Sequence, residues 1–583
     1  MSKNISNGLV LEERYALEEV PQKPEAHISD SGEQYWVERS GCATCHDPTE
    51  STVGPSYEAI ANRYEATREN RAMLAERVQK GSTGIWGDAV MIPHPKMKIE
   101  DIEKIIVYMM SFRSVKVIEE APLPPARKKE MDVVSSPGFG SPLVDVHPAY
   151  DLINIRPDAF QPKVGAMAFE PDGSLLVATW DSIGPLYRLS NLESDNAELV
   201  DIDTIASGLC EPLGMTVVDN EIYVMQKQEL TKLEDNDADG IIDAYICINN
   251  SFGVTPDFHE FSYGLVYHEG LFYGGLGLAM RLMSTERQLE DRGTVFSVSN
   301  TRDFKLIANG FRQPNGVGLG PDGEIFATEN QGQWVPSCKF VHVKQDHFYG
   351  CKFVTGDRFD DKVETPPAVW LPQHDIGNSP GQPILIQDGP YTGQMMHGEV
   401  SNGGIKRVFL EKRNGEYQGC VFRFFQGLEA GIQKVEYSPD GSLYVGGVGM
   451  KGGWSHHDHE FGLQKLRYNG KVPFEMLSVS SQQDGFEVEF TTPLSDAVTF
   501  DQSKLDVRQF QYVPTAAYGG PKVNVTDLPV SGISISDDRR KIQLKIDGLK
   551  EGYVIHFLLD ESLMDSMGQK LWTGEAWYTL NAK

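Results

Sequence analysis

The sequence contains no apolar run long enough to cross a lipid bilayer, so no membrane-spanning helix is predicted. Its first residues, Met1–Pro21, are polar and acidic and lack the basic and long apolar regions of a signal peptide. Positive charge is also scarce, because 53 lysines and arginines face 83 acidic residues and leave a net charge of −30. This imbalance repels nucleic acids and anionic membrane faces, and it favours neutral substrates or cationic partners.

Cysteine is scarce as well, with seven in 583 residues. Two belong to the motif described next, and the odd remainder excludes complete pairing of the other five, which are Cys210, Cys247, Cys338, Cys351 and Cys420. Cys338 and Cys351 flank a hairpin-like stretch and either form a disulfide or are two unconnected buried thiols. A chain of this length exceeds a single hydrophobic core, so two to four domains are expected.

The stretch Ser40–Asp47 carries the attachment signature of a c-type haem, Cys42-Ala-Thr-Cys45-His46. Two cysteines at this spacing present sulfurs for thioethers to the haem vinyl groups, and the adjacent histidine supplies an axial nitrogen to the iron. The alternatives for a Cys-x-x-Cys pair are a redox dithiol or half of a zinc site. We therefore predict covalent haem c bound through Cys42, Cys45 and His46.

The second axial ligand is sought downstream, where residues 81–95 hold a Trp-Gly loop, Met91 and a proline-rich turn before a predicted helix at residues 99–113. This order resembles the small bacterial class I cytochromes c, in which such a loop ends in the ligating methionine. The resemblance implies Met91 as the sixth ligand. Met97 and His94 are the rivals, but Met97 lies at the helix entrance, where methionine is commonly packing, and prolines restrict His94 on both sides.

These signals predict an N-terminal extension (1–30) and an all-α class I cytochrome c domain (31–114). Residues 115–147 are rich in proline and glycine without helical or strand periodicity, which is typical of a linker. Covalent haem attachment is typical of periplasmic, secreted or surface proteins. We expect such a location, with a leader that this sequence does not show.

A repeated pattern begins after the linker. Residues 167–179, 317–328 and 435–446 each contain an apolar stretch, a Pro-Asp-Gly turn and a second apolar stretch, which is the pattern of a β-hairpin. Weaker copies lie at 214–225 and 264–275, and a further strand pair lies near 394–410. Repeats of this length predict a β-propeller over residues 148–472, with six blades favoured and five or seven as alternatives.

The repeats stop near Phe474, and alternating apolar and polar residues continue to Asn581. This alternation predicts an antiparallel immunoglobulin-like β-sandwich over residues 473–583. No chemical motif is evident there, so a spacing or docking role is expected.

An acidic loop, Asp235-Asn-Asp237-Ala-Asp239-Gly240-Ile-Ile-Asp243, places carboxylates at alternate positions beside a glycine. It resembles a calcium loop of the EF-hand or dockerin type, although Ile246 stands where the EF-hand has a bidentate glutamate. The prediction is structural calcium bound by Asp235, Asp237, Asp239 and Asp243. A solvated acidic loop is the alternative.

Two segments, Gly310-Phe-Arg-Gln-Pro-Asn-Gly316 and Ala327-Thr-Glu-Asn-Gln-Gly332, resemble a blade of the soluble quinoprotein glucose and sorbosone dehydrogenases. In that family, arginine and amide side chains at these points bind the carboxylates of pyrroloquinoline quinone. The resemblance implies an anion clamp at Arg312 with amide partners at Gln313, Asn330 or Gln331. The residues alone also allow Arg312 to pair with Glu329 across a hairpin.

The segment Asp257-Phe-His259-Glu260 opens a predicted strand and resembles the strand start that carries the general base of those dehydrogenases. Histidine beside a carboxylate suits removal of a hydroxyl proton at neutral pH, although a histidine also caps strands for structural reasons. The cluster at residues 456–460 contains three histidines and is interpreted as a polar loop, because no second anchoring segment for a metal is evident.

The predicted domain order resembles large secreted bacterial haem proteins with a dehydrogenase-type propeller. It implies an extracytoplasmic oxidoreductase in which His259 and Arg312 act on a sugar-like alcohol or aldehyde and a redox partner protein accepts electrons from the haem. A quinone between substrate and haem completes the electron count, because two electrons leave the substrate and one haem carries one. The alternatives are a non-catalytic electron carrier whose propeller binds a glycan or protein, and a calcium-dependent propeller hydrolase with an accessory cytochrome.

Overall fold

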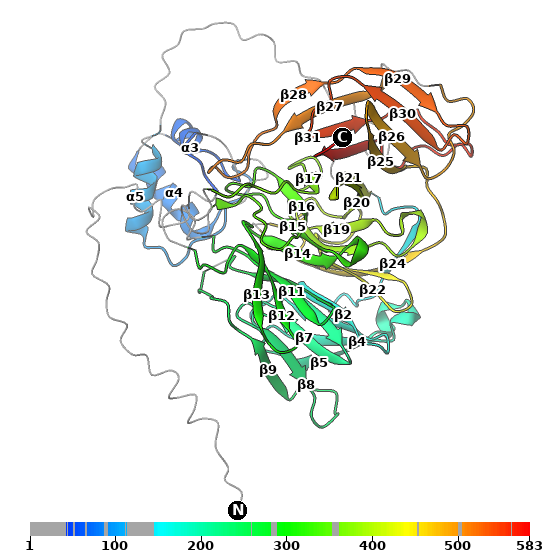
Figure 1. Cartoon of the computed structure of the whole chain (residues 1–583). Helices are drawn as coiled ribbons and strands as arrows, with labels where there is room; N and C mark the ends of the chain where they lie inside the picture. Colours follow the sequence, from blue (N-terminus) through cyan, green and yellow to red (C-terminus); the bar gives the residue numbers. More distant parts are fainter. Residues whose placement is uncertain are drawn as a thin grey trace, which may run out of the picture. The chain divides into compact units, whose positions relative to one another are not determined.

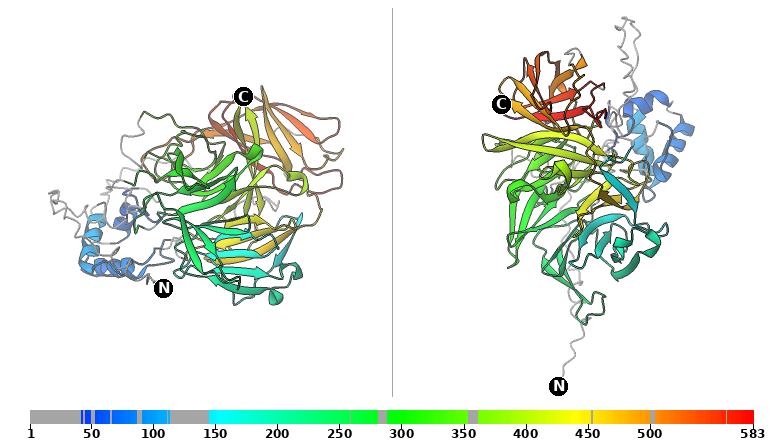
Figure 2. Two further views of the ribbon diagram at one scale, coloured as in Figure 1. Left: turned by 60° about the horizontal axis from the view of Figure 1, so that its bottom comes forward. Right: turned by 90° about the vertical axis from the view of Figure 1, so that its right-hand side faces the viewer.

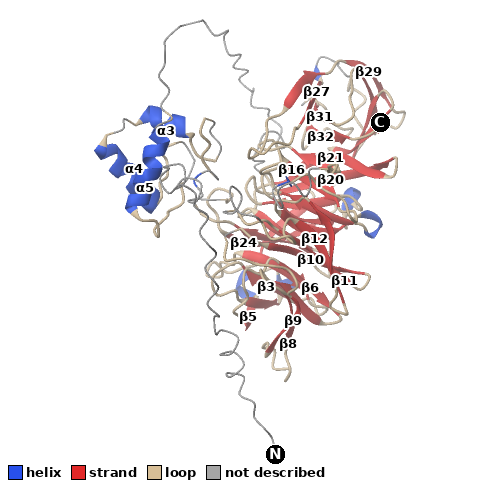
Figure 3. Ribbon diagram, turned by 60° about the vertical axis from the view of Figure 1, so that its left-hand side comes forward, coloured by secondary structure: helices blue, strands red, loops and turns tan. Residues whose placement is uncertain are grey.

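The computed structural model describes residues 42, 45–49, 53–64, 67–86, 91–110, 112, 145–257, 259–280, 288–352, 361–451, 454–499, 504–560 and 562–583. Its contacts divide the chain into one unit of residues 1–86 and 93–117 and a second of residues 87–92 and 118–583. The α-helices belong to the first unit and the β-strands to the second (Figures 1 and 3). Within the described residues, no helix has the length and apolar character needed to span a membrane. The predicted extension and nearly all of the predicted linker lie outside the described residues.

The first unit contains α3 (Tyr57–Arg63), α4 (Arg68–Lys80) and α5 (Ile99–Met110). The hydroxyl of Ser56 caps α3 by accepting the N–H of Ala59 at 3.0 Å, as is typical of a helix N-terminus. The predicted final helix is confirmed as α5, which buries one face. Its inward side chains pack with Cys42 and Tyr57, so the helices form one core with the cysteine-containing turn.

The second unit is a propeller-like arrangement of β-sheets. Six groups of four antiparallel strands, here called sets, follow one another along the chain (Figures 1 and 2). The bounds in the first two sets are β2 (Val164–Phe169), β3 (Leu175–Thr179), β4 (Leu186–Ser190) and β5 (Asp201–Ala206), then β6 (Gly214–Val218), β7 (Glu221–Met225), β8 (Leu230–Glu234) and β9 (Ala244–Asn249). Those in the third and fourth are β10 (Ser262–His268), β11 (Leu271–Leu276), β12 (Thr294–Ser299) and β13 (Phe304–Asn309), then β14 (Pro314–Leu319), β15 (Ile325–Glu329), β16 (Cys338–His342) and β17 (Val369–Leu371).

The last two sets draw on strands distant in sequence. The fifth contains β18 (Pro380–Leu385), β19 (Met395–Glu399), β20 (Ile405–Arg413) and β21 (Glu416–Phe425). The sixth contains β22 (Ile432–Tyr437), β23 (Leu443–Val448), β24 (Phe461–Tyr468) and, as its outer strand, β1 (Tyr150–Asn154). β1 pairs antiparallel with β24, so the beginning of the strand region completes its final set.

The first strands of the sets contact one another in the order β2, β6, β10, β14, β18 and β22, and β22 contacts β2. Glycines permit this approach. A Cβ on Gly214 would lie 2.4 Å from the carbonyl carbon of Gly264, and one on Gly316 would lie 2.4 Å from Cα of Gln382. Since these residues lie near the beginnings of their strands, the strand beginnings gather at one end, here called the site end.

The three predicted Pro-Asp-Gly hairpins are confirmed as β2–β3, β14–β15 and β22–β23. Their turn glycines have positive φ, 92° at Gly173, 75° at Gly323 and 84° at Gly441, which glycine adopts without steric cost. The predicted pair near 394–410 is also confirmed, but it joins the second and third strands of the fifth set.

The hydrophobic core lies between neighbouring sets rather than at one centre. For example, Met215 and Val224 of the second set pack on Ala166 and Leu176 of the first. Analogous buried clusters join each set to the next, including the sixth to the first. Each set therefore buries its faces against its neighbours, and the fifth set also packs Cys420 and Phe422 into the core of the C-terminal strands.

The C-terminal strands form two four-stranded layers around a shared core. One layer is β25 (Met476–Gln482), β26 (Gly485–Phe490), β30 (Lys541–Ile546) and β29 (Val530–Ile535); the other is β32 (Glu575–Leu580), β31 (Tyr553–Leu558), β27 (Asp506–Gln511) and β28 (Val523–Asp527). β32 pairs with β21, so the second layer and the fifth set are one eight-stranded sheet (Figure 2). The C-terminal strands are thus joined to the propeller-like region through backbone hydrogen bonds.

Candidate functional site

The Cys-x-x-Cys-His motif forms a tight turn in the first unit. The backbone N–H of Cys45 lies 3.2 Å from the carbonyl of Cys42, and that of His46 lies 3.0 Å from the same oxygen. Cys42 and His46 are both buried. The turn therefore places Cys42 of the motif in the helical core, with His46 buried close to it in the sequence.

The ring of His46 is held through one nitrogen. Its Nδ1 lies 2.6 Å from the carbonyl oxygen of Pro55 and donates a hydrogen bond to it, which leaves Nε2 for a metal. Burial lowers the pKa of His46 and favours the neutral, metal-binding form. Gly54 is required here, because a Cβ would lie 2.6 Å from Cε1 of the imidazole. This donor set fits an axial ligand of haem iron.

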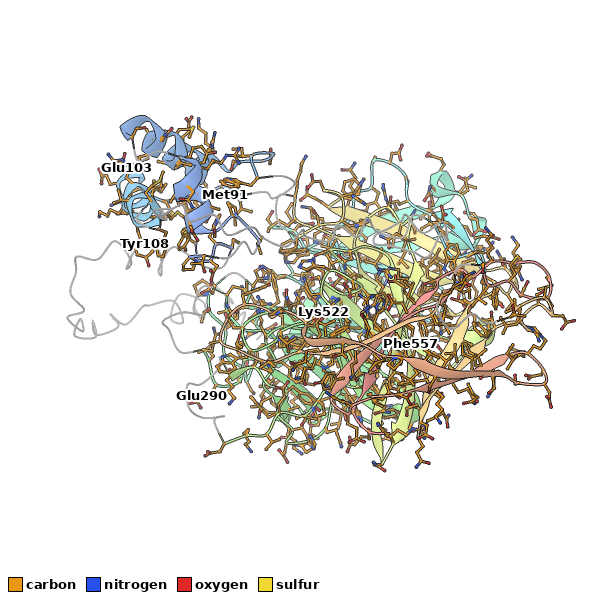
Figure 4. All side chains as sticks on the ribbon, turned by 90° about the horizontal axis from the view of Figure 1, so that it is seen from above. Met91, Glu103, Tyr108, Glu290, Lys522 and Phe557 are labelled. Atoms are coloured by element: carbon orange, nitrogen blue, oxygen red, sulfur yellow. The ribbon has the colours of Figure 1, made fainter. Side chains whose placement is uncertain are left out.

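The Trp-Gly loop is fastened to α3. The guanidinium of Arg63 donates to the carbonyl of Ile85 at 2.6 Å and lies 4.4 Å from the ring centroid of Trp86. Met97 packs against the core that contains Cys42. Met91, half-buried and labelled in Figure 4, lies between α4 and α5 in the sequence, in the short segment that the contacts assign to the second unit. Its role as the sixth ligand stays a prediction.

At the site end of the second unit, Arg312 is buried beside Glu329, but the two side chains do not form an ion pair. The carboxylate of Glu329 instead accepts the backbone N–H groups of Arg312, at 3.1 Å, and Gln313, at 2.9 Å. Burial raises the pKa of Glu329 to about 7, although these hydrogen bonds and the charges of Lys339 and Arg312 oppose that rise.

The guanidinium of Arg312 retains capacity for an anion. One terminal nitrogen donates to the carbonyl of Gln331 at 2.7 Å, and the other lies 2.9 Å from the sulfur of Met280. Its Nε is buried without a hydrogen-bond partner, and no carboxylate lies within ion-pairing distance, among the residues that the structure describes. A buried cation without a paired carboxylate favours binding of an anionic group.

The structure brings His259 to the same end. Burial, followed by the positive charges of Arg312 and Lys227, lowers the pKa of His259 to about 3. Its backbone has a positive φ of 66°, a conformation that is uncommon for a non-glycine residue and clusters at functional sites. The imidazole is therefore neutral across the physiological range and lies within the electrostatic influence of Arg312.

Gln313 connects these two residues. Its amide nitrogen donates to the carbonyl oxygens of His259, at 3.0 Å, and Leu278, at 2.6 Å, while its amide oxygen accepts the hydroxyl of Tyr263 at 2.9 Å. All three hydrogen-bond partners of the Gln313 side chain are groups of the protein itself. Gln313 therefore fixes the strand start that carries His259.

The other two predicted amides lie after β15. Asn330 contacts the hydroxyl of Ser379 at 3.4 Å and the thiol of Cys338 at 3.5 Å. Gln331 donates from Nε2 to the carbonyl of Pro336 at 3.2 Å. Both are only partly buried, so each keeps some exposed surface near Arg312. Cys338 is a buried thiol, which agrees with the second of the two alternatives left open for Cys338 and Cys351.

Two tryptophans at this end were not predicted from the sequence. Trp180 follows β3 and Trp454 follows β23, and their ring centroids are 5.2 Å apart. The rings of His259 and Trp454 are separated by 6.3 Å, and those of His259 and Phe261 by 5.0 Å. The usable signal was position in the repeat, since Trp180 comes directly after the second strand of its repeat and Trp454 lies in the loop that follows the second strand of its own. Aromatic faces beside a polar group suit a ligand that has both an apolar face and hydrogen-bonding groups.

The acidic loop joins β8 to β9 at the end of the sets opposite the site end. Carboxylate oxygens of Asp235, Asp237 and Asp239 lie within 4.8 Å of one another, and all three side chains are exposed. Asp243 lies outside that group and accepts the N–H of Asn236 at 2.8 Å. Gly240 has the positive φ, 90°, that the turn requires. The loop therefore places three of the four predicted ligands together, away from His259 and Arg312.

The histidine cluster at residues 456–460 lies in a loop of the sixth set. His456 is buried, with Nε2 3.2 Å from the side-chain nitrogen of Gln426 and Nδ1 3.3 Å from the carbonyl oxygen of Ser401. His457 and Asp458 follow with positive φ. Among the residues that the structure describes, the acidic loop is the one group whose ligand atoms lie close enough together to hold a metal ion.

A covalent-haem turn on a small helical core defines the first unit as a c-type cytochrome. The chain belongs to the cytochrome c family, whose model matches residues 29–113. Cytochrome c2 of Rubrivivax gelatinosus is 45% identical over 69 residues, which span 12% of this chain and 81% of that protein. Cytochrome c-552 of Hydrogenobacter thermophilus is 33% identical over 78 residues, 13% of this chain and 76% of that protein. Haem c and a redox function follow from this membership.

Over part of its length the chain is similar to solved structures of sugar dehydrogenases. A putative oxidoreductase (glucose dehydrogenase) of Thermus thermophilus has 17% identity and a TM-score of 0.41, covering 55% of this chain and 100% of that one. The aldose sugar dehydrogenase of Streptomyces coelicolor, in its PQQ-bound form, has 14% identity and a TM-score of 0.39, with the same coverage.

Proposed function

We propose that this protein is an extracytoplasmic haem oxidoreductase, in which the propeller-like region oxidises a sugar-like alcohol or aldehyde and passes the electrons to haem c. In this proposal the propeller-like region is a six-bladed propeller over residues 148–472, the C-terminal strands are an immunoglobulin-like sandwich, and a redox partner protein takes electrons from the haem. The haem is held by Cys42 and Cys45 with His46 and Met91 as axial ligands.

The observation that carries the proposal is the convergence of His259 and Arg312 at the site end. They precede the first strands of neighbouring sets, and the charge of Arg312 contributes to the low pKa of His259. A neutral imidazole is able to accept a proton from a substrate hydroxyl, although the lowered pKa makes His259 a weaker base than a free histidine. A well-placed general base whose pKa lies near the operating pH is typically worth about 10²–10⁴-fold in rate. Trp180 and Trp454 provide aromatic surface beside it.

Arg312 fits an anionic cofactor, because its guanidinium is buried and carries no paired carboxylate among the described residues. Asn330 and Gln331 would hold such a group beside it. Pyrroloquinoline quinone, when bound, would supply the two-electron acceptor that a one-electron haem does not provide. His259 removes the hydroxyl proton, Gln313 holds the backbone of His259, and Glu329 holds the backbone of Arg312.

We also propose that Ca²⁺ binds the acidic loop through Asp235, Asp237, Asp239 and Asp243. The first three already place ligand oxygens close together, and an adjustment of Asp243 would complete an all-oxygen set that calcium prefers. Because the loop is remote from His259, this ion stabilises the fold and takes no part in the reaction.

The test is haem reduction by a panel of sugars, monitored by absorbance with and without pyrroloquinoline quinone and Ca²⁺. His259→Gln should abolish sugar-driven reduction while reduction by dithionite stays unchanged. The matched control is His268→Gln, which should behave as wild type, because His268 lies at the far end of β10, the strand that His259 precedes. If no sugar reduces the haem under any of these conditions, the chain is a non-catalytic electron carrier. If sugars reduce the haem and His259→Gln behaves as wild type, His259 is not the general base.

A further inference from the structure

A loop from the C-terminal strands lies against Arg312. Residues 512–522 connect β27 to β28, and within them Tyr518 places its ring 5.0 Å from the guanidinium carbon of Arg312. This distance is within the range of a cation–π contact. Tyr518 is partly exposed whereas Arg312 is buried, so the ring covers the cation and still meets solvent.

The loop is held in place by backbone hydrogen bonds to the segment after β15. The N–H of Trp334 donates to the carbonyl of Thr515 at 2.7 Å, the N–H of Gly519 to that of Gly332 at 3.0 Å, and the N–H of Gly520 to that of Pro336 at 2.9 Å. Gln333 and Tyr518 form an antiparallel bridge. The contact between Tyr518 and Arg312 therefore rests on an anchored backbone.

The other end of the loop is fixed by side chains. Lys522, labelled in Figure 4, forms an ion pair with Asp375, and the indole N–H of Trp577 donates to the same carboxylate at 3.2 Å. The ring of Tyr512 lies 5.1 Å from that of Trp370 in β17. One end of the loop is thus attached to β17 of the fourth set, and the other to Asp375 in the segment between β17 and β18.

At the two glycines of this loop, Gly519 and Gly520, the structure leaves no room for a side chain. A Cβ on Gly519 would lie 2.5 Å from the amide nitrogen of Gln331, and one on Gly520 would lie 2.9 Å from Cβ of Pro336. The loop therefore packs closely against Gln331, whose carbonyl oxygen holds one end of the guanidinium. Two constraints on Arg312 meet at this point, one from Gln331 and one from Tyr518.

We propose that Tyr518 is a positioning residue for Arg312, and that the C-terminal strands thereby form part of the anion-binding site rather than a spacer. The inference rests on the proposed function for the identity of the anion, a polycarboxylate quinone. The ring restricts the guanidinium by cation–π attraction and limits its access to water. An anion then meets a cation already fixed in place, which reduces the entropic cost of binding.

The experiment uses the full haem-loaded chain with Ca²⁺ and titrates pyrroloquinoline quinone against binding and against sugar-driven haem reduction. Tyr518→Ala should raise the half-saturating quinone concentration roughly three- to thirtyfold, the range of a cation–π contact, and leave the saturated rate within about twofold of wild type. Tyr518→Phe keeps the ring and should restore wild-type affinity. Arg312→Ala combined with Tyr518→Ala should bind no more weakly than Arg312→Ala alone, because the tyrosine acts through the arginine.

Tyr553→Ala is the matched control, since Tyr553 lies over Lys550 at 5.5 Å in the same C-terminal strands but away from Arg312. It should leave quinone affinity unchanged. Citrate serves as a second polycarboxylate probe, detected by thermal stabilisation. If the quinone fails to bind wild type but citrate binding depends on both Arg312 and Tyr518, the proposed function fails and the positioning role stands. The positioning role is overturned if Tyr518→Ala binds as wild type, if Tyr518→Phe is as defective as Tyr518→Ala, or if neither anion binds wild type.

Discussion

Replacing Gly332 by alanine should displace the side chain of Arg312 while leaving the arginine itself unmutated. A Cβ at this position would lie 2.0 Å from Cδ and 2.0 Å from Nε of the arginine. Ordinary carbon contacts begin near 3.5 Å, so the side chain has to move by about 1.5 Å. These atoms belong to the middle of the side chain, which gives the guanidinium little freedom to remain where it is.

The displacement should be measurable in both stability and ligand binding. Overpacking of a well-packed site costs about 1–3 kcal/mol in the free energy of unfolding. Loss of a hydrogen bond from a charged group is worth about 1.5–3 kcal/mol. The second figure corresponds to a rise of roughly 10- to 150-fold in the half-saturating quinone concentration. Urea unfolding gives the first quantity, and quinone titration of haem reduction gives the second.

Gly532→Ala is the control, because a Cβ there would meet Cβ of Lys545 at 3.5 Å, an ordinary contact. It should change neither quantity. If Gly332→Ala lowers stability but retains wild-type quinone affinity while Arg312→Ala does not, the position of the guanidinium is unimportant and the reasoning is refuted.

Three further predictions concern the haem, the acidic loop and the general base. Replacing Met91 should remove the sulfur-to-iron charge-transfer band and lower the potential; the same effect from Met97 but not from Met91 would reverse the ligand assignment. Chelation of Ca²⁺ should lower the melting temperature, since an ion that binds only the folded state stabilises it, and Asp237→Ala should abolish that dependence. A wild-type melting temperature that does not change on chelation would contradict the calcium site. The pKa of His259 is lowered from 6.5 to about 3, so between these pH values the folded chain binds fewer protons than the unfolded chain. The contribution of this residue to the free energy of unfolding is therefore complete above pH 6.5 and is lost as the pH falls towards 3. The rate constant kcat/KM for sugar oxidation should accordingly show no acid limb near pH 6.5; a limb there would mean that His259 titrates normally.

The hairpins were predictable because their determinants are local. A Pro-Asp-Gly turn between apolar stretches specifies strand, turn and strand within about twelve residues. The first strand of the fifth set was missed, because β18 begins with Pro380 and also contains Pro383, and proline weakens a strand signal. The pairing of β1 with β24 has no local signal, since the two strands are more than 300 residues apart.

The site was predictable only in part. The proximity of Arg312 and Glu329 follows from hairpin register, since Pro314 pairs with Glu329. The sequence could not show that Glu329 binds backbone N–H groups rather than the guanidinium. Tyr518 carries no motif, and its relation to Arg312 depends on the junction of β21 with β32.

That junction also bears on how the chain is made. The first four sets are each continuous in the sequence, so they are able to form in order during synthesis, whereas β21 waits for β32. Until then β21, which runs from Glu416 to Phe425, has an unpaired edge, and a long exposed edge is a template for pairing with another chain. A ribosome that stops before β32 would release a protein with a complete haem motif and an unpaired edge on β21. Cellular quality control would be expected to remove such a product.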